Sequence, residues 1–211
     1  MEHNTSIIKS VKNEFLNSTI DLTIDYAEIG LDTFLDNNAI REIPFVKTVV
    51  GIVKFGLSVK EMFDLKKLLI FFKELNDNTI SEEKLNSFKS KFNTDEKYRN
   101  KVVEAIVLWN ERYLDINKSR ILANLIKAHI EGNLTWDELN DLSPVLDTIH
   151  PKGFKFIKKM SEQNWENHGR NHDYEPLMYS CGIGLRHGTS FTISKMGQDL
   201  YYYGIKPVYF I

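Results

Sequence analysis

The sequence predicts a mainly α protein: a helical, bundle-like body over residues 1–145, followed by a small α+β module over residues 146–211. Three observations lead to this fold class. Apolar residues recur at helical spacing through most of the first part, an unusually apolar stretch runs from Pro44 to Leu75, and two short extended runs flank Gly188. A change of periodicity of this kind marks the start of a different architecture.

Composition narrows the functional classes. At 211 residues the chain is long enough to bury a sizeable core without disulfides, and its one cysteine, Cys181, excludes an internal disulfide and fits a reducing compartment. The N-terminal residues lack the basic start and apolar core of a secretory signal, so we expect a cytoplasmic protein. The 27 basic and 29 acidic side chains nearly cancel, so the whole chain has no strong field to attract nucleic acid. Locally the balance shifts, from 19 basic and 24 acidic side chains in residues 1–150 to 8 and 5 in residues 151–211.

The first expected helix covers Phe15 to Leu35. Its apolar positions recur at helical spacing, and an acidic row runs beside them. The row consists of Asp21, Asp25, Glu28, Asp32 and Asp36. It faces water, faces the lysines of the next helix, or binds a cation or basic partner.

The stretch from Pro44 to Leu75 predicts a central helix, kinked or broken near Gly56. If it is read as helical from its start, its polar side chains fall on one line and apolar residues cover the other faces. The polar line is Lys47, Gly51, Lys54, Ser58 and Glu61. A helix of this kind must be covered by protein or lipid, so we expect it to be the buried pillar of the body. The residues predicted to serve a protein partner or self-association are Val46, Val50, Val53 and Leu57.

Lysines interrupt the same stretch. A bilayer-spanning helix needs about 20 apolar residues, and Lys47, Lys54 and Lys60 divide the run into shorter pieces. A resting membrane span is therefore not expected. Release of the helix onto a membrane interface stays open as an alternative.

Further helices complete the predicted body. They begin near Ser81, after a cap at Thr94, and at the Thr135–Glu138 capping box, with a break expected at Ser143-Pro144. After the cap at Thr94, Ile121, Leu125 and Ile126 continue the helical pattern until Gly132. In the C-terminal part we expect helices over Gly153–Met160, Tyr174–Gly182 and Met196–Tyr203, a hairpin turning at Gly188, and a possible terminal strand from Lys206.

The segments Cys181-Gly-Ile-Gly-Leu, Phe191-Thr-Ile-Ser and Met196-Gly-Gln-Asp-Leu resemble the wing and closing helix of winged helix-turn-helix domains. The resemblance implies that the preceding helix enters the major groove and that the wing grips phosphate. That helix, Tyr174-Glu-Pro-Leu-Met-Tyr-Ser-Cys, lacks the side chains that read base edges, so any binding would be sequence-blind. The residues expected to contact phosphate are Lys155, Lys158, Lys159, Arg170, Arg186 and His187. The alternative is a degenerate winged helix that packs against protein.

The body resembles bacterial helical proteins grouped with the abortive-infection (Abi-alpha) phage-defence proteins. Three segments carry this resemblance: Ile43-Pro-Phe-Val-Lys-Thr, the run from Lys66 to Leu75, and Lys127-Ala-His-Ile-Glu-Gly-Asn. It implies a biological setting and no chemistry.

No catalytic constellation is visible in the sequence. His168 and His172 have the i, i+4 spacing of paired metal ligands, but they lack further ligands, and Cys181 sits on an apolar helix without a thiolate-stabilising neighbour. We therefore expect no metal, no cofactor and no enzymatic activity. The leading hypothesis is an interaction protein of phage defence that binds a protein partner or itself. The alternatives are a DNA-binding regulator that uses the C-terminal module and a membrane-perturbing effector that uses residues 44–75.

Overall fold

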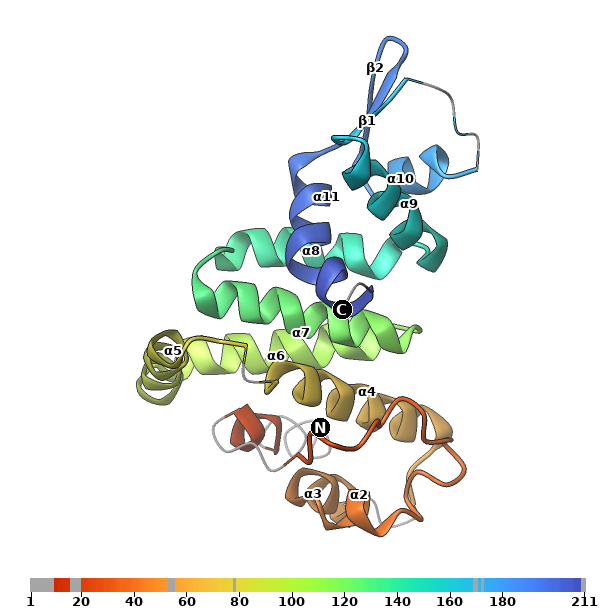
Figure 1. Cartoon of the computed structure of the whole chain (residues 1–211). Helices are drawn as coiled ribbons and strands as arrows, with labels where there is room; N and C mark the ends of the chain where they lie inside the picture. The colour runs from red at the N-terminus through yellow and green to blue at the C-terminus, as the bar shows by residue number, and fades with distance from the viewer. Residues whose placement is uncertain are drawn as a thin grey trace. The chain divides into compact units, whose positions relative to one another are not determined.

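The computed structural model describes residues 10–15, 20–52, 56–77, 79–168, 171 and 173–209. The protein is predominantly helical, with one small antiparallel sheet near the C-terminus, as the sequence predicts (Figure 1). The chain divides into two compact units, residues 1–119 and residues 120–211, whereas the sequence analysis placed its boundary at residue 145.

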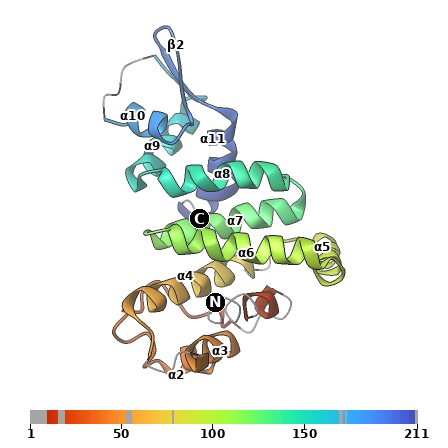
Figure 2. The same ribbon diagram turned by 180° about the vertical axis from the view of Figure 1, so that it is seen from behind.

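The first unit is built around helix α4. Its helices are α2 (Asn38–Glu42), α3 (Pro44–Ile52), α4 (Val59–Leu75), α5 (Glu82–Thr94) and α6 (Glu96–Arg112), and the next helix, α7 (Ile116–Glu131), starts at its end. In both views α4 lies between α6 on one side and the α2–α3 pair on the other (Figure 1 and Figure 2). Eight consecutive residues, 65 to 72, are buried, so the middle of α4 is covered on its whole circumference. The expectation of a buried central helix is confirmed for α4.

The predicted break near Gly56 is also confirmed. Gly56 has φ +85°, and α4 begins after Ser58, whose hydroxyl accepts from the Glu61 N–H while the Glu61 carboxylate accepts from the Ser58 N–H. Ser58 and Glu61 thus form the capping box of a new helix. The polar line predicted for one continuous helix is therefore wrong, because α3 and α4 are separate elements; Lys54 and Val53 lie outside the described residues.

The helix predicted over Phe15–Leu35 is wrong for residues 20–37, which form a series of turns. The carboxylates of Asp21 and Asp25 accept from backbone N–H groups two residues further on, at 2.9 and 3.0 Å. Such local bonds compete with helix formation. In a helix, the carbonyls of this segment would accept from backbone N–H groups. Here two lysines of α4 donate to some of these carbonyls instead. Lys73 Nζ donates to the Ile24 carbonyl at 2.6 Å, and Lys66 Nζ donates to the carbonyls of Ala27 and Ile29.

Helix α6 starts one residue later than predicted. The Asp95 side chain accepts from the Tyr98 N–H at 2.9 Å, so Asp95 is the N-cap. Thr94 is instead the last residue of α5, and its hydroxyl donates to the Ser90 carbonyl.

The second unit starts with the rest of α7 and continues with α8 (Trp136–Thr148) and α9 (Pro151–Glu162). The capping box of Thr135 and Glu138 is confirmed, with bonds of 3.2 and 2.7 Å. The break predicted at Ser143-Pro144 is wrong, because α8 continues through Pro144. The Ser143 hydroxyl donates to the Leu139 carbonyl within the same turn.

The C-terminal module is winged-helix-like. It contains β1 (Glu166–Asn167), α10 (Glu175–Ser180), and the hairpin of β2 (Gly184–His187) and β3 (Ser190–Ile193), with sheet order β1-β3-β2. Gly188, at φ +60°, turns the hairpin as predicted. Leu185 pairs with Thr192 and Arg186 with Phe191, which places Phe191 and Ile193 in the core.

The closing helix is longer than predicted. It runs through α11 (Lys195–Asp199), the π-helix η1 (Leu200–Ile205) and α12 (Lys206–Tyr209), so the terminal strand expected from Lys206 is wrong as far as Tyr209. A Cβ on Gly204 would stand 2.8 Å from Ile121 and 3.2 Å from Leu125, so this glycine permits the close contact between η1 and α7.

Tyr26 gives the first unit a measurable dependence on pH. It is fully buried, its hydroxyl donates to the Asp21 carbonyl at 3.0 Å, and burial raises the pKa of the phenol to about 12. Because the folded phenol keeps its proton to a higher pH than the unfolded one, its stabilisation is complete below pH 10 and is lost as the pH rises towards 12. The full shift corresponds to a loss on the order of 2 kcal/mol.

We expect Tyr26→Phe to lose about 1 kcal/mol at pH 8, where the hydrogen bond is removed, but to lose less further stability than the wild type between pH 8 and pH 11. Urea unfolding at the two pH values measures the difference. An equal decline in both proteins would contradict the role given to Tyr26. The pKa of Tyr98, which burial also raises, is common to both proteins and cancels in the comparison.

Candidate functional site

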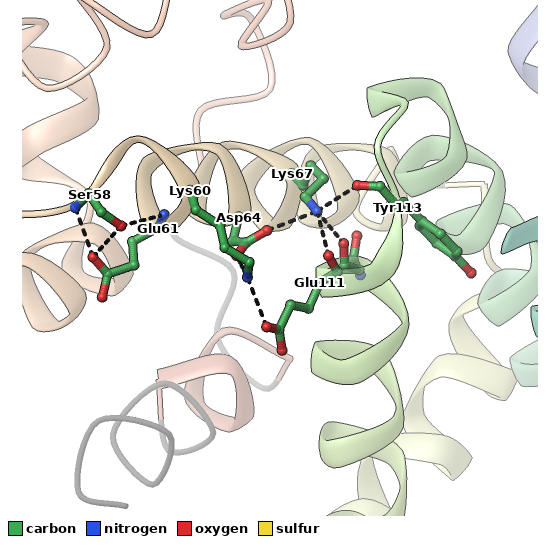
Figure 3. A network of polar contacts seen from close by, with 8 residues as sticks. Ser58, Lys60, Glu61, Asp64, Lys67, Glu111 and Tyr113 are labelled. Carbon is green, nitrogen blue, oxygen red and sulfur yellow. Dashed lines mark hydrogen bonds and ion pairs between the residues drawn. The ribbon is translucent and has the colours of Figure 1, made fainter.

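The most tightly organised polar site in the first unit surrounds Lys67 of α4 (Figure 3). Its ammonium nitrogen donates to the carbonyls of Asn110, Glu111 and Tyr113, at 2.5, 3.2 and 2.8 Å, and lies 2.9 Å from Asp64 Oδ1. The Lys67 side chain is 1 % exposed. Three backbone carbonyls and one carboxylate therefore surround a buried positive charge.

This arrangement closes the C-terminus of α6. The last carbonyls of a helix have no partner inside the helix, and they carry the negative end of the helix dipole. Lys67 supplies both the donors and the charge that this end requires. Burial lowers the pKa of Lys67, while the hydrogen bond that its ammonium group donates to Asp64 opposes this effect.

A second lysine links the same two helices at the surface. Lys60 Nζ lies 2.8 Å from Asp64 Oδ2 and 2.8 Å from Glu111 Oε1. These hydrogen bonds raise the pKa of Lys60. Glu111 is thus held through its side chain by Lys60 and through its carbonyl by Lys67, which fixes the chain where it leaves α6 (Figure 3).

Three large aliphatic side chains that are close in sequence to these charged residues are exposed. Among the described large hydrophobic residues they have the highest exposed fractions: Val59 69 %, Leu108 58 % and Leu114 91 %. Val59 precedes Lys60, Leu108 lies one helical turn before Glu111, and Leu114 follows the last residue that Lys67 binds. We call these three residues the aliphatic corner. Neither Leu108 nor Leu114 was recognised from the sequence.

The structure describes three of the four residues predicted to bind a partner. Val46 is fully buried, Val50 and Leu57 are half-buried, and Val53 lies outside the described residues. Val46 and Val50 line an open cavity of about 460 Å³ on α2 and α3. The full lining is Leu35, Asp36, Asn38, Arg41, Glu42, Val46, Lys47, Val50 and Gly51. We call this hollow the α2–α3 cavity.

The residues predicted to contact phosphate lie on two elements of the second unit. Lys155 and Lys159 are exposed on α9, and Lys158 is half-buried and 3.9 Å from Glu162. The hairpin carries the other two described residues. His187 is exposed, but Arg186 is engaged: it forms a 2.8 Å ion pair with Glu175 and donates to the Thr189 carbonyl. Arg170 lies outside the described residues.

The hairpin also brings a serine, a histidine and a glutamate together. Ser190 Oγ lies 2.8 Å from His168 Nδ1, and His168 Nε2 lies 3.9 Å from Glu166. Sequence reasoning missed this set because 22 residues separate the serine from the histidine. His168 and Glu166 are exposed by 76 % and 57 %, so water competes for both, and 3.9 Å is too long for a hydrogen bond. The arrangement ties β1 to β3 and lacks the buried, oriented base of a nucleophilic triad.

Metal and thiol chemistry receive no support from the described residues. Within that part of the chain, no group of three or more His, Cys, Asp or Glu side chains is placed to hold a metal ion. His172 of the proposed pair lies outside it. Cys181 is buried, and its thiol donates to the Leu177 carbonyl, which agrees with the packing role expected from the sequence. None of the helices in the described ranges combines the length and the apolar character needed to cross a bilayer.

The Lys67 site gives a direct prediction for stability. Lys67→Met keeps the length of the side chain but removes the ammonium donor from three carbonyls and the buried partner from Asp64. We expect it to cost about 3 kcal/mol or more, measured by urea unfolding. Lys60→Met is the control on the same helix, because it removes an exposed ion pair and should cost about 1 kcal/mol or less. Equal effects of the two substitutions would show that burial does not distinguish the sites.

Comparisons with known proteins leave the function to be argued from the residues themselves. A scan against protein-family models found no match. Searches of curated proteins and of solved structures also found no match.

Proposed function

We propose that the protein is a non-enzymatic interaction protein of bacterial phage defence that acts by binding protein partners or other copies of itself. The observation that supports this proposal most directly is the aliphatic corner. Exposed apolar side chains grouped within a polar rim are typical of protein-binding sites, and these three are the most exposed large hydrophobic residues that the structure describes.

The stiffness of the backbone at the corner strengthens the argument. Leu114 follows Tyr113, whose carbonyl is bound by Lys67, and Leu108 lies on the last turns of α6, which the same lysine closes. A side chain on a fixed backbone loses little conformational freedom when a partner covers it. An aliphatic side chain presented in this way is suited to anchor a contact.

The defence setting rests on the resemblance of the body to Abi-alpha proteins, and the aliphatic corner provides the way to test it. We expect Leu114→Glu to reduce protection against phage at least about tenfold. The reason is that a charge at the contact costs more than about 1.4 kcal/mol of binding free energy. Plaque counts on a bacterial host that expresses the chain measure this protection. Leu185→Glu, a matched change at a 44 % exposed leucine on β2, should leave protection unchanged. Full protection by the Leu114 variant would count against the proposal.

A second candidate function, binding to the nucleic-acid backbone, is favoured by helix α9. Lys152, Lys155 and Lys159 are exposed at positions i, i+3 and i+7, on one side of the helix, and within the described residues no acidic side chain pairs with them. Neighbouring like charges of this kind destabilise a helix by about 0.2–0.5 kcal/mol per pair. A chain of phosphates would relieve this repulsion.

This candidate predicts weak duplex binding that decreases steeply with salt. Lys155→Glu should weaken binding on every sequence tested and lower the slope of log K against log salt by about 0.9, the value for one lost phosphate contact. Lys84→Glu, the same charge change on α5 of the first unit, should leave the slope unchanged. Fluorescence anisotropy at several salt concentrations gives both slopes. Equal effects of the two substitutions on binding would show that only the overall charge matters, and α9 would be rejected as the binding surface.

A further inference from the structure

The α2–α3 cavity has the size of a ligand pocket and is large enough to admit a side chain. Its volume of about 460 Å³ falls within the range of roughly 300–1,000 Å³ found for ligand pockets. Leu35, Val46 and Val50 provide apolar lining, and charged side chains of α2 and α3 surround them.

Gly51 adds an independent observation. It lies in the last turn of α3, and no described atom stands within 4 Å of the position that a Cβ would occupy. Glycine inside a helix costs about 0.5–1 kcal/mol relative to alanine. Within the described residues, no close packing at this position requires a glycine. The missing side chain instead leaves the backbone of α3 open to close approach from outside, at the edge of the cavity.

The charges at the rim are of both signs. Glu42 and Lys47 pair with each other at 2.6 Å. Arg41 lies beside Glu42, and its charge contributes to lowering the pKa of the Glu42 carboxyl. Together with Asp36, these residues give the rim both acids and bases beside an apolar floor.

The aliphatic corner carries the complementary features on the same unit. Leu114 projects into water, with Arg112 two residues before it and Asp115 directly after it. A leucine flanked by a base and an acid complements, in charge, an apolar hollow whose rim carries Asp36 and Arg41.

We propose that Leu114 of one copy of the chain inserts into the α2–α3 cavity of a second copy. This inference rests on the proposed function and specifies its partner as the chain itself. In the contact, Arg112 faces Asp36 and Asp115 faces Arg41 of the other copy. Because the two surfaces differ, the contact is heterologous, so a pair keeps one free cavity on one copy and one free leucine on the other, and assembly continues into a ring or an open chain.

Two variants that each remove one of the two surfaces test this geometry. Val50→Asp places a charge in the cavity, and Leu114→Asp removes the inserted side chain; both positions lie outside the fully buried core. The wild type should show a mass that rises with concentration in sedimentation velocity or light scattering. Each variant should be a monomer, with self-association weakened at least about tenfold.

Mixing the two variants is the decisive step. The Leu114→Asp variant keeps an intact cavity, and the Val50→Asp variant keeps an intact leucine, so an equimolar mixture should form a 1:1 dimer that grows no further. A contact between two identical surfaces would give no such rescue. Circular dichroism checks the fold of both variants, and Arg41→Glu, an exposed change on the rim, replaces Val50→Asp in the mixture if that variant does not fold.

The outcomes separate this inference from the proposed function. A wild-type chain that stays monomeric at every concentration would overturn the self-insertion, as would a mixture that stays monomeric or variants that still assemble. If phage protection is nevertheless lost in Leu114→Glu, the interaction function stands with a foreign partner. If the mixture forms the dimer but protection does not depend on Leu114, the contact exists and the proposed function fails.

Discussion

The first unit depends on one constraint: lysine ammonium groups in the interior of α4 must find oxygen partners, and they find them on the backbone. Lys66 and Lys67 lie in a stretch where every residue is buried. A buried charge without partners would cost several kcal/mol. Lys67 meets the open end of α6, and Lys66 meets the turns that precede α2. Two segments with unsatisfied carbonyls are therefore held by the same helix that needs acceptors for its charges.

The same residue type has different roles according to its burial. On α4, Lys67 is structural because its ammonium group donates to three carbonyls and pairs with Asp64. On α9, Lys152, Lys155 and Lys159 are exposed to water on one side of the helix. The structural lysines also determine which apolar residues are exposed, since the chain that Lys67 fixes at the end of α6 continues directly into Leu114. The exposure of Leu114 thus follows from the hydrogen bonds by which Lys67 binds the carbonyls at the end of α6.

Features with a local cause could be predicted from the sequence, and features with a distant cause could not. The Thr135–Glu138 capping box, the turn at Gly188 and the restart after Gly56 are each determined by residues within one turn of the chain. The turns of residues 20–37 depend on Lys66 and Lys73, which lie 37 to 49 residues away. A helical pattern in that segment was therefore overridden by contacts that no local window contains. Pro144 is a similar case, because α8 tolerates it where the local signal indicates a break.

The candidate site follows the same division. The apolar character of Val46 and Val50 is visible in the sequence, but their burial and the cavity between α2 and α3 depend on how those helices pack. Leu114 could not be recognised as exposed, because an isolated leucine between two helices reads equally well as a core residue. Paired lysines in the middle of an otherwise apolar run were the available signal for the α4 site, since charges at such positions need buried partners.

The enclosure of Lys67 also determines which amines of the protein are open to covalent chemistry. With 1 % of its side chain accessible, it is shielded from acylating reagents and from modifying enzymes while the first unit stays closed, whereas the lysines of α9 are open to both. Labelling of Lys67 would thus report the fraction of molecules in which the end of α6 has come away from α4, independently of any partner.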